Sequence, residues 1–165
     1  MINAYSLAAE VLYGDMDKTY PIINQSEMKL RDKTMKLSEK TLTLLKNFSK
    51  KLDKTKFSVF VNLSARVGSI TDNRLGGWIS YRSSKAALNQ IIKTSSIEIN
   101  RRNKNAICVG LHPGTVKTRF TEKFQNTTET ISPDESVEMM MKVVENLSTD
   151  DNGYCFAYDG KAIPA

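Results

Sequence analysis

Three short runs rich in β-branched and aromatic residues alternate with longer segments of helical periodicity. The runs are FSVFVNL (57–63), AICVGL (106–111) and GYCFAY (153–158). The helical segments are 26–52, 79–100 and one that opens at Ser132. Strands that alternate with helices predict an α/β layer built on a mostly parallel sheet. Because the strands are apolar without interruption, we expect them to be buried on both faces.

The length and the apolar content fit one globular domain, 1–165. The chain has 165 residues, of which 40% are hydrophobic, and a domain near this size buries roughly 70% of the surface of its unfolded chain. Its start has no positive segment followed by an apolar core, and no run approaches the length of a membrane span. These features disfavour secretion and membrane insertion, so we expect a cytoplasmic location.

The positive charge is confined to one segment. Ser26 to Lys56 holds ten Lys or Arg against four Asp or Glu, which accounts for the whole net charge of +6. Phe48 is the only aromatic residue in the segment, too few to interleave with its basic residues and stack on bases, so we interpret the segment as a solvated helix face and expect no nucleic-acid partner. Cys108 and Cys155 lie within strand-like runs and are expected to be buried, reduced thiols. No cysteine and histidine cluster suggests a metal site.

Periodicity predicts which helical residues face the core. Residues 5–25 are interpreted as loop, and the helix after them starts at Ser26 or at Ser38. The helix that opens at Ser132 has a serine cap, a proline at the first helical position and acidic residues in the first turn. We expect the following residues to face the core: Ala87, Leu88, Ile91, Ile92 and Ile97 in the central helix, and Val137, Met139, Met140, Met141 and Val144 in the last one.

The residues that carry chemistry lie between Asn62 and Lys85. Tyr81 and Lys85 are four residues apart and share one face of a helix. An ammonium held near a phenol favours the phenolate, which lets a tyrosine exchange a proton with a carbonyl or alcohol oxygen near neutral pH. A hydroxyl from the preceding strand end would bind the same oxygen, and Ser64 and Ser69 are both available.

The order of these motifs resembles the short-chain dehydrogenase/reductase family. ARVGSITDNRLGGWISYRSSKAALN followed by LHPGTVKT is similar to the carbonyl reductase branch typified by C-factor, with the strongest match over 57–120. The resemblance implies the C-terminal portion of a doubly wound, Rossmann-like sheet and an NAD(P) cofactor. It makes Tyr81 the catalytic acid/base and Lys85 the group that lowers its pKa and binds the nicotinamide ribose. It also implies that a loop beside the nicotinamide contains Pro113, Gly114, Val116 and Thr118.

Three positions depart from the family pattern. Ala65 stands where the family has its catalytic serine, so either Ser69, twelve residues before Tyr81, or Ser64 would have to replace it. Leu37 falls near the position of a family asparagine. Met1–Ser6 resembles the family's fourth strand, and no G-x-x-x-G-x-G turn for the cofactor pyrophosphate occurs in the sequence. We therefore expect the N-terminal cofactor-binding half to be missing and NAD(P) to bind weakly or not at all.

Two functions follow from this resemblance. The first is NAD(P)-dependent reduction of a small carbonyl compound, or oxidation of the alcohol, by an incomplete chain. The alternative is a remnant of the family without catalysis that binds a partner. A homo-oligomer through the helices at 26–52 and 79–100 is compatible with either.

Overall fold

A computed structural model describes residues 41–119, 121 and 129–165. The described chain contains a helical segment at 41–48 followed by the 3-10 turn η1 (Ser49–Lys51). Its strands are β1 (Ser58–Leu63), β2 (Ala106–His112), β3 (Cys155–Ala157) and β4 (Ala162–Ile163). Its long helices are α3 (Ile79–Arg102) and α4 (Pro133–Glu145), and two further 3-10 turns are η2 (Arg66–Gly68) and η4 (Thr149–Asp151).

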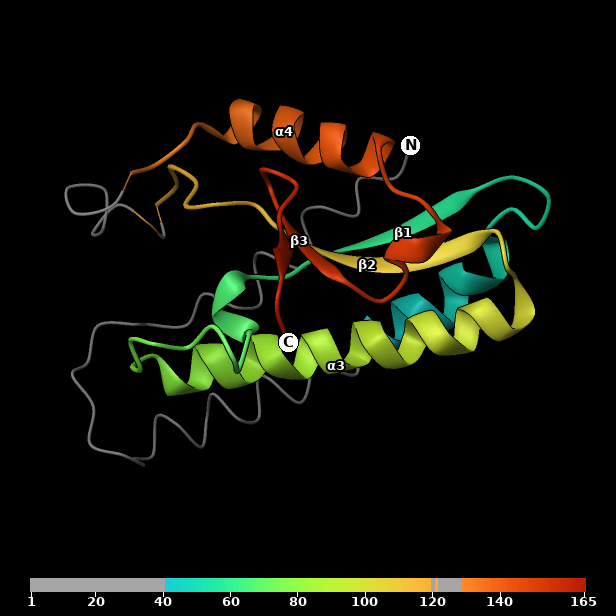
Figure 1. The fold of residues 1–165 in the computed structure, drawn as a ribbon, viewed down its shortest axis with the longest axis horizontal. Helices are drawn as coiled ribbons and strands as arrows, with labels where there is room; N and C mark the ends of the chain where they lie inside the picture. The colour runs from blue at the N-terminus through green and yellow to red at the C-terminus, as the bar shows by residue number, and fades with distance from the viewer. Residues whose placement is uncertain (1–40, 120, 122–128) are drawn as a thin grey trace.

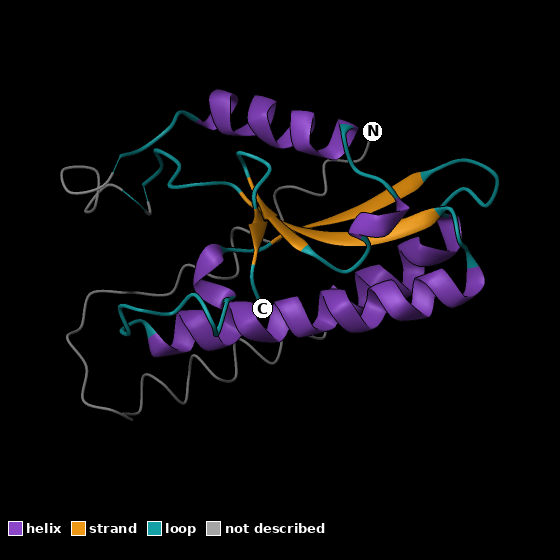
Figure 2. Ribbon diagram, viewed as in Figure 1, coloured by secondary structure: helices purple, strands orange, loops and turns teal. Residues whose placement is uncertain are grey.

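The strands form one sheet in the order β1-β2-β3-β4. β1 pairs with β2 in parallel, with Ser58 opposite Ala106 and Leu63 opposite Leu111. β2 pairs with β3 in parallel, and the short β4 returns antiparallel to β3. The sheet lies between two helical layers, with α4 on one face and α3 with the 41–51 segment on the other (Figures 1 and 2). The expected α/β fold with a Rossmann-like parallel sheet is confirmed.

Alternating side chains of β2 supply both halves of the core. Ala106 and Cys108 pack with Leu88, Ile92 and Ile99 of α3 and with Leu45. On the other face, Ile107, Val109 and Leu111 pack with Met140 of α4 and Phe156 of β3. Because successive side chains of a strand point to opposite faces, one apolar run serves two layers.

The two long helices begin in different ways, and only α4 has the N-terminal cap that the sequence predicts. Ser132 accepts a hydrogen bond from the Glu135 amide at 3.1 Å, and Pro133 occupies the first turn, as the sequence predicts. α3 has no capping side-chain hydrogen bond, and its N-cap is Trp78 in the left-handed region at φ 48°. The structure also shows that Ile97, Val137 and Met141 are exposed, so their assignment to the core is wrong.

Several sequence predictions lie outside the described residues. They are the loop at 5–25, the start of the helix at Ser26 or Ser38, the position of Leu37, and the strand expected at Met1–Ser6. Within the described part of the chain, no helix is both long and apolar enough to cross a membrane.

Candidate active site

Tyr81 and Lys85 lie in the first two turns of α3, and the Lys85 ammonium contacts the end of β1. The Lys85 Nζ lies 5.9 Å from the centre of the Tyr81 ring. Four residues along an α-helix bring two side chains onto one face, and the structure places this pair as the spacing predicts. The ammonium therefore lies over the face of the aromatic ring, within the range of a cation–π contact.

Lys85 is buried despite its charge. Its side chain is 5% exposed, and its Nζ donates a hydrogen bond to the Leu63 carbonyl at 3.2 Å. Burial lowers the pKa of Lys85 to about 8, because the charged form loses its hydration. The ammonium still carries its proton at neutral pH and has further N–H groups to donate, since an ammonium has three.

A glycine permits this close approach of loop and helix. Gly68 of η2 is buried, and a Cβ on it would lie 2.7 Å from the Lys85 carbonyl carbon. Any side chain would therefore push the loop away from α3 at the residue that carries the ammonium. This is the local reason why the segment after β1 can close over Lys85.

The two candidate serine hydroxyls are both buried, and each has a hydrogen-bond partner. Ser64 follows β1 and donates to the Asn89 side-chain oxygen. The Ser69 hydroxyl accepts from the Asp72 amide at 3.0 Å and donates to the Ala165 carbonyl at 3.4 Å. Ser64 is 4% exposed and Ser69 is 1% exposed. A substrate oxygen would have to displace one of these contacts to bind either hydroxyl.

Asn89 is the site residue that sequence reasoning missed. It lies four residues after Lys85, so Tyr81, Lys85 and Asn89 follow one face of α3 over two helical turns. Its side-chain oxygen accepts from the Ser64 hydroxyl and from the Cys155 thiol, the latter at 3.3 Å. Asn89 thereby joins the end of β1 to the start of β3. The signal in the sequence was its continuation of the Tyr81–Lys85 spacing.

The loop after β2 is held from two sides. Ser136 of α4 donates to the Pro113 carbonyl at 2.7 Å. Gly114 adopts a positive φ of 79°, and a Cβ there would lie 2.9 Å from the Tyr158 ring. Val116 forms an isolated parallel bridge with Ile131, and the Thr118 amide donates to the Thr121 hydroxyl at 3.0 Å. All four predicted cofactor-loop residues therefore lie in one loop at the carboxyl end of β2.

His112 ends β2 beside this loop and is largely buried. Its ring lies edge-on to Tyr158, with centroids 6.4 Å apart. Burial, followed by the positive charges of Arg66 and Lys85, lowers the pKa of His112 to about 4, so the imidazole is neutral near pH 7. Its Nδ1 has no hydrogen-bond partner among the described residues. No group of three potential metal ligands occurs among those residues either.

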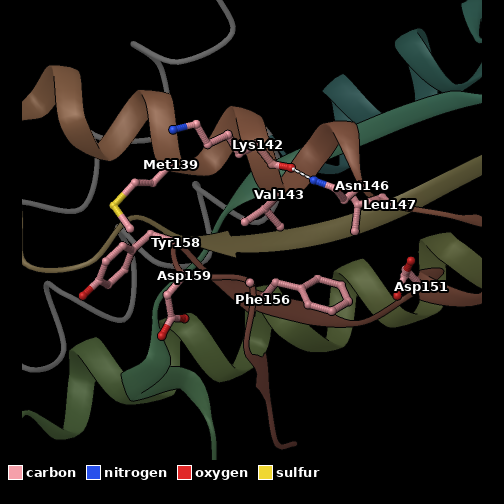
Figure 3. Close-up of a pocket in the computed structure, with 10 residues that line it drawn as sticks. Met139, Lys142, Val143, Asn146, Leu147, Asp151, Phe156, Tyr158 and Asp159 are labelled. Carbon is pink, nitrogen blue, oxygen red and sulfur yellow. Dashed lines mark hydrogen bonds between the residues drawn. The ribbon is translucent and has the colours of Figure 1, made fainter.

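A separate cavity of about 420 Å³ lies between α4 and the β3–β4 segment (Figure 3). Its lining residues are Met139, Lys142, Val143, Asn146, Leu147, Asp151, Phe156, Tyr158, Asp159 and Gly160. The Asn146 side chain there donates to the Lys142 carbonyl at 2.6 Å (Figure 3). Tyr81 and Lys85 do not line this cavity. Tyr158 lines it and also neighbours Gly114, so the cavity borders the cofactor-type loop from the α4 side.

Comparisons with known proteins find relatives by sequence and by structure. No protein-family model matches the chain. An uncharacterized oxidoreductase of Schizosaccharomyces pombe is 36% identical over 134 residues, which cover 73% of this chain and 52% of that protein. The C-signal protein of Myxococcus xanthus is 33% identical over 103 residues, which cover 62% of this chain and 58% of that one. The chain spans about half the length of the curated relatives it matches.

Solved structures give the same result. The carbonyl reductase Sniffer of D. melanogaster matches with a TM-score of 0.69 and 27% identity, covering 93% of this chain and 64% of that one. An NADPH-bound carbonyl reductase from chicken fatty liver matches with a TM-score of 0.65 and 32% identity over the same shares. In sequence and in fold, the chain is therefore similar to oxidoreductases over part of their length. Within that class, these two similar structures are carbonyl reductases.

Proposed function

We propose that this chain carries the acid–base half of an NAD(P)-dependent short-chain oxidoreductase site that reduces a small carbonyl compound or oxidises the corresponding alcohol. The observation that carries the proposal is the pairing of Tyr81 with the buried ammonium of Lys85 on α3. The pair lies at the carboxyl end of the parallel strands, which is where open α/β sheets bind their ligands.

The chain's own residues supply the proton chemistry. During reduction Tyr81 donates its phenolic proton to the carbonyl oxygen as the C=O bond becomes a C–O–H group, and in the reverse direction the phenolate takes that proton back. Lys85 makes the exchange possible near neutral pH because its charge stabilises the phenolate. When bound at this site, a nicotinamide cofactor would provide the hydride chemistry at the carbonyl carbon, which would balance the two electrons.

The residues present suit the nicotinamide end of such a cofactor. Lys85 uses one N–H group on the Leu63 carbonyl and has two more for a ribose hydroxyl. Pro113, Gly114, Val116 and Thr118 form a loop that Ser136 and Tyr158 hold in place beside the strand ends. Either Ser69 or Ser64 would complete the site at the substrate oxygen, and we favour Ser69. Alanine substitution at each position, in this chain joined to the N-terminal half of a full-length relative, distinguishes them. A larger loss of turnover at Ser64 with unchanged thermal stability would reverse that choice.

The decisive experiment joins this chain to the N-terminal half of a full-length relative and measures carbonyl reduction. Tyr81→Phe is expected to lower turnover by about 10²- to 10⁴-fold without unfolding the protein, because a positioned acid is removed. Tyr154→Phe is the matched control, since Tyr154 is exposed just before β3 and its ring lies under the ammonium of Lys93 rather than that of Lys85. Near-normal turnover by Tyr81→Phe would overturn the proposal.

A second measurement concerns the cofactor and this chain alone. Dinucleotide affinity in such folds depends on backbone N–H groups at a Gly-rich helix start, and the sequence contains no such turn. A few hydrogen bonds at about 1 kcal/mol each do not offset the several kcal/mol of motion lost on binding. We expect calorimetric titration with NADH and NADPH to show affinity no better than about millimolar. Saturable binding at micromolar concentration would contradict this expectation.

The competing function is a family member that binds a partner without catalysis. Ala65 favours it, because this buried residue stands at the usual serine position and the neighbouring hydroxyls are already hydrogen-bonded. The joined protein separates the two functions. If it binds NADPH but shows no turnover with aldehydes or ketones, the non-catalytic function is favoured.

A further inference from the structure

The turn that leads into α3 has an unusual backbone. Gly76, Gly77 and Trp78 all adopt positive φ angles, of 65°, 68° and 48°. Among the described residues Trp78 is the only one other than glycine with a positive φ. A side chain in the left-handed region costs about 1 kcal/mol or more per residue, so the surroundings must hold such a conformation in place.

One arginine holds this turn. The Arg82 Nε donates to the Gly77 carbonyl at 3.0 Å and to the Gly76 carbonyl at 3.2 Å. Its Nη2 donates to the Gly76 carbonyl at 3.0 Å. The planar fork of a guanidinium reaches two consecutive carbonyls at once, which a lysine ammonium does not reproduce. Arg82 directly follows Tyr81, so the group that fixes the turn is built into the catalytic helix.

The segment from Ile70 to Ile79, which leads to the proposed acid, exposes several apolar side chains. Ile70 and Leu75 are 76% and 93% exposed, and Trp78 and Ile79 are 37% and 53% exposed. Trp78 precedes Tyr81 by three residues, which is less than one helical turn. An exposed apolar side chain three residues from a proton donor suits a carbonyl compound whose substituent is a hydrocarbon.

We propose that Arg82 is a positioning residue: it fixes the Gly76–Trp78 turn and so places Trp78 to contact the hydrocarbon part of an apolar carbonyl substrate beside Tyr81. The substrate half of this inference rests on the proposed function. The placement of Trp78 by Arg82 does not, because it concerns the folded chain alone.

The placement is tested on the full chain through its single tryptophan. Fluorescence quenching by acrylamide reports the exposure of Trp78 without interference from another indole. Arg82→Gln and Arg82→Lys are both expected to raise the quenching constant of Trp78 by roughly twofold. Trp78 is now 37% exposed, so the upper limit is the constant of a fully exposed tryptophan. Arg74→Gln, in the same loop, removes an equal charge outside the hydrogen bonds to the turn and is expected to leave the constant unchanged.

The two Arg82 variants separate geometry from charge. If Trp78 is quenched in Arg82→Lys as it is in the parent, a positive charge alone is enough to hold the turn, and the proposed role of the guanidinium fork is overturned. If both variants quench as the parent does while circular dichroism shows a folded chain, Arg82 does not place Trp78. An increase that Arg74→Gln shows to the same extent also overturns the proposal, since the loop would then respond to charge in general.

The substrate half is tested in the protein joined to the N-terminal half of a relative. Arg82→Gln is expected to raise the KM for acetophenone on the order of tenfold, because the charge-assisted hydrogen bonds that hold the turn are lost. The kcat and the KM for acetone are expected to stay within about twofold. Equal changes for both ketones would overturn the substrate half. An inactive parent would overturn the proposed function and this half with it, while the fluorescence result would still decide the placement of Trp78.

Discussion

Strands β1 and β2 are neighbours with similar sequences, yet they are buried to different degrees. Residues 106–111 of β2 are all buried, whereas all six residues of β1 are only half-buried. β2 lies between β1 and β3 and has α3 over one face and α4 over the other. β1 is at the edge of the described sheet. The difference teaches that an apolar run identifies a strand, while its neighbours in the sheet determine how deeply it is buried.

The sharpest test of this comparison uses two valines that face each other. Val61 of β1 pairs with Val109 of β2, and Val109 is 0% exposed. Val109→Ala is expected to lower the free energy of unfolding by about 2–3 kcal/mol, because two methyl groups and their close packing are lost. Val61→Ala is expected to cost about 1 kcal/mol, since water already reaches part of that side chain. Urea denaturation of both variants measures the difference, and equal costs would show that β1 is covered as completely as β2 in solution.

The strand ends extend the comparison to pH. Lys85 of α3 binds the carbonyl at the end of β1, and burial lowers its pKa from 10.5 to about 8. His112 is the last residue of β2, and its pKa is lowered, chiefly by burial, from 6.5 to about 4. Between pH 8 and 10.5 the unfolded chain binds a proton on Lys85 that the folded chain has released. Stability therefore rises with pH through that window because of Lys85, and through pH 4 to 6.5 because of His112.

Two substitutions assign these windows. Lys85→Met is expected to remove the rise above pH 8 and to stabilise the chain at pH 7 by about 2 kcal/mol, because a desolvated charge is lost. The gain is partly offset because the Leu63 carbonyl loses its donor. His112→Gln is expected to flatten only the acidic window. Thermal melts from pH 4 to 10.5 measure both effects, and a rise above pH 8 that survives in Lys85→Met would assign it to another group.

The sequence predicted the α/β order, the Ser132 cap and the Tyr81–Lys85 pair because each depends on local spacing. The assignment of Ile97 to the core was wrong because Ile97 and Ile99 cannot both face the sheet. Side chains two positions apart on a helix are separated by about 200° of rotation, so they point to nearly opposite sides. Ile99 shares its face with Leu88 and Ile92 and is the buried one. In the same way, only Met140 of the three consecutive methionines is buried.

The polar contacts of the site were not accessible to the same reasoning. Asn89 binds groups from the end of β1 and the start of β3, which are distant from it in sequence. Arg82 binds backbone carbonyls of the preceding turn, and any residue type presents the same carbonyl. A spacing rule finds pairs on one helix face, whereas these partners are brought together only by the tertiary fold. Thus spacing could name Tyr81 and Lys85 and place Asn89 on the same helix face, but it could not name the partners that Asn89 and Arg82 bind.

The two thiols give the smallest expected effect. They extend the comparison of strand burial from β2 to β3. Burial raises the pKa of Cys108 in β2 to about 12 and that of Cys155 in β3 to about 11, from 9.0. Only the thiolate reacts with iodoacetamide, so at pH 8 both cysteines are expected to react far more slowly than in urea, with Cys155 reacting first. Single Cys→Ala variants and mass spectrometry assign the two rates. Faster modification of Cys108 would show that β2 opens to solvent more readily than β3, which is the reverse of the burial that the fold provides.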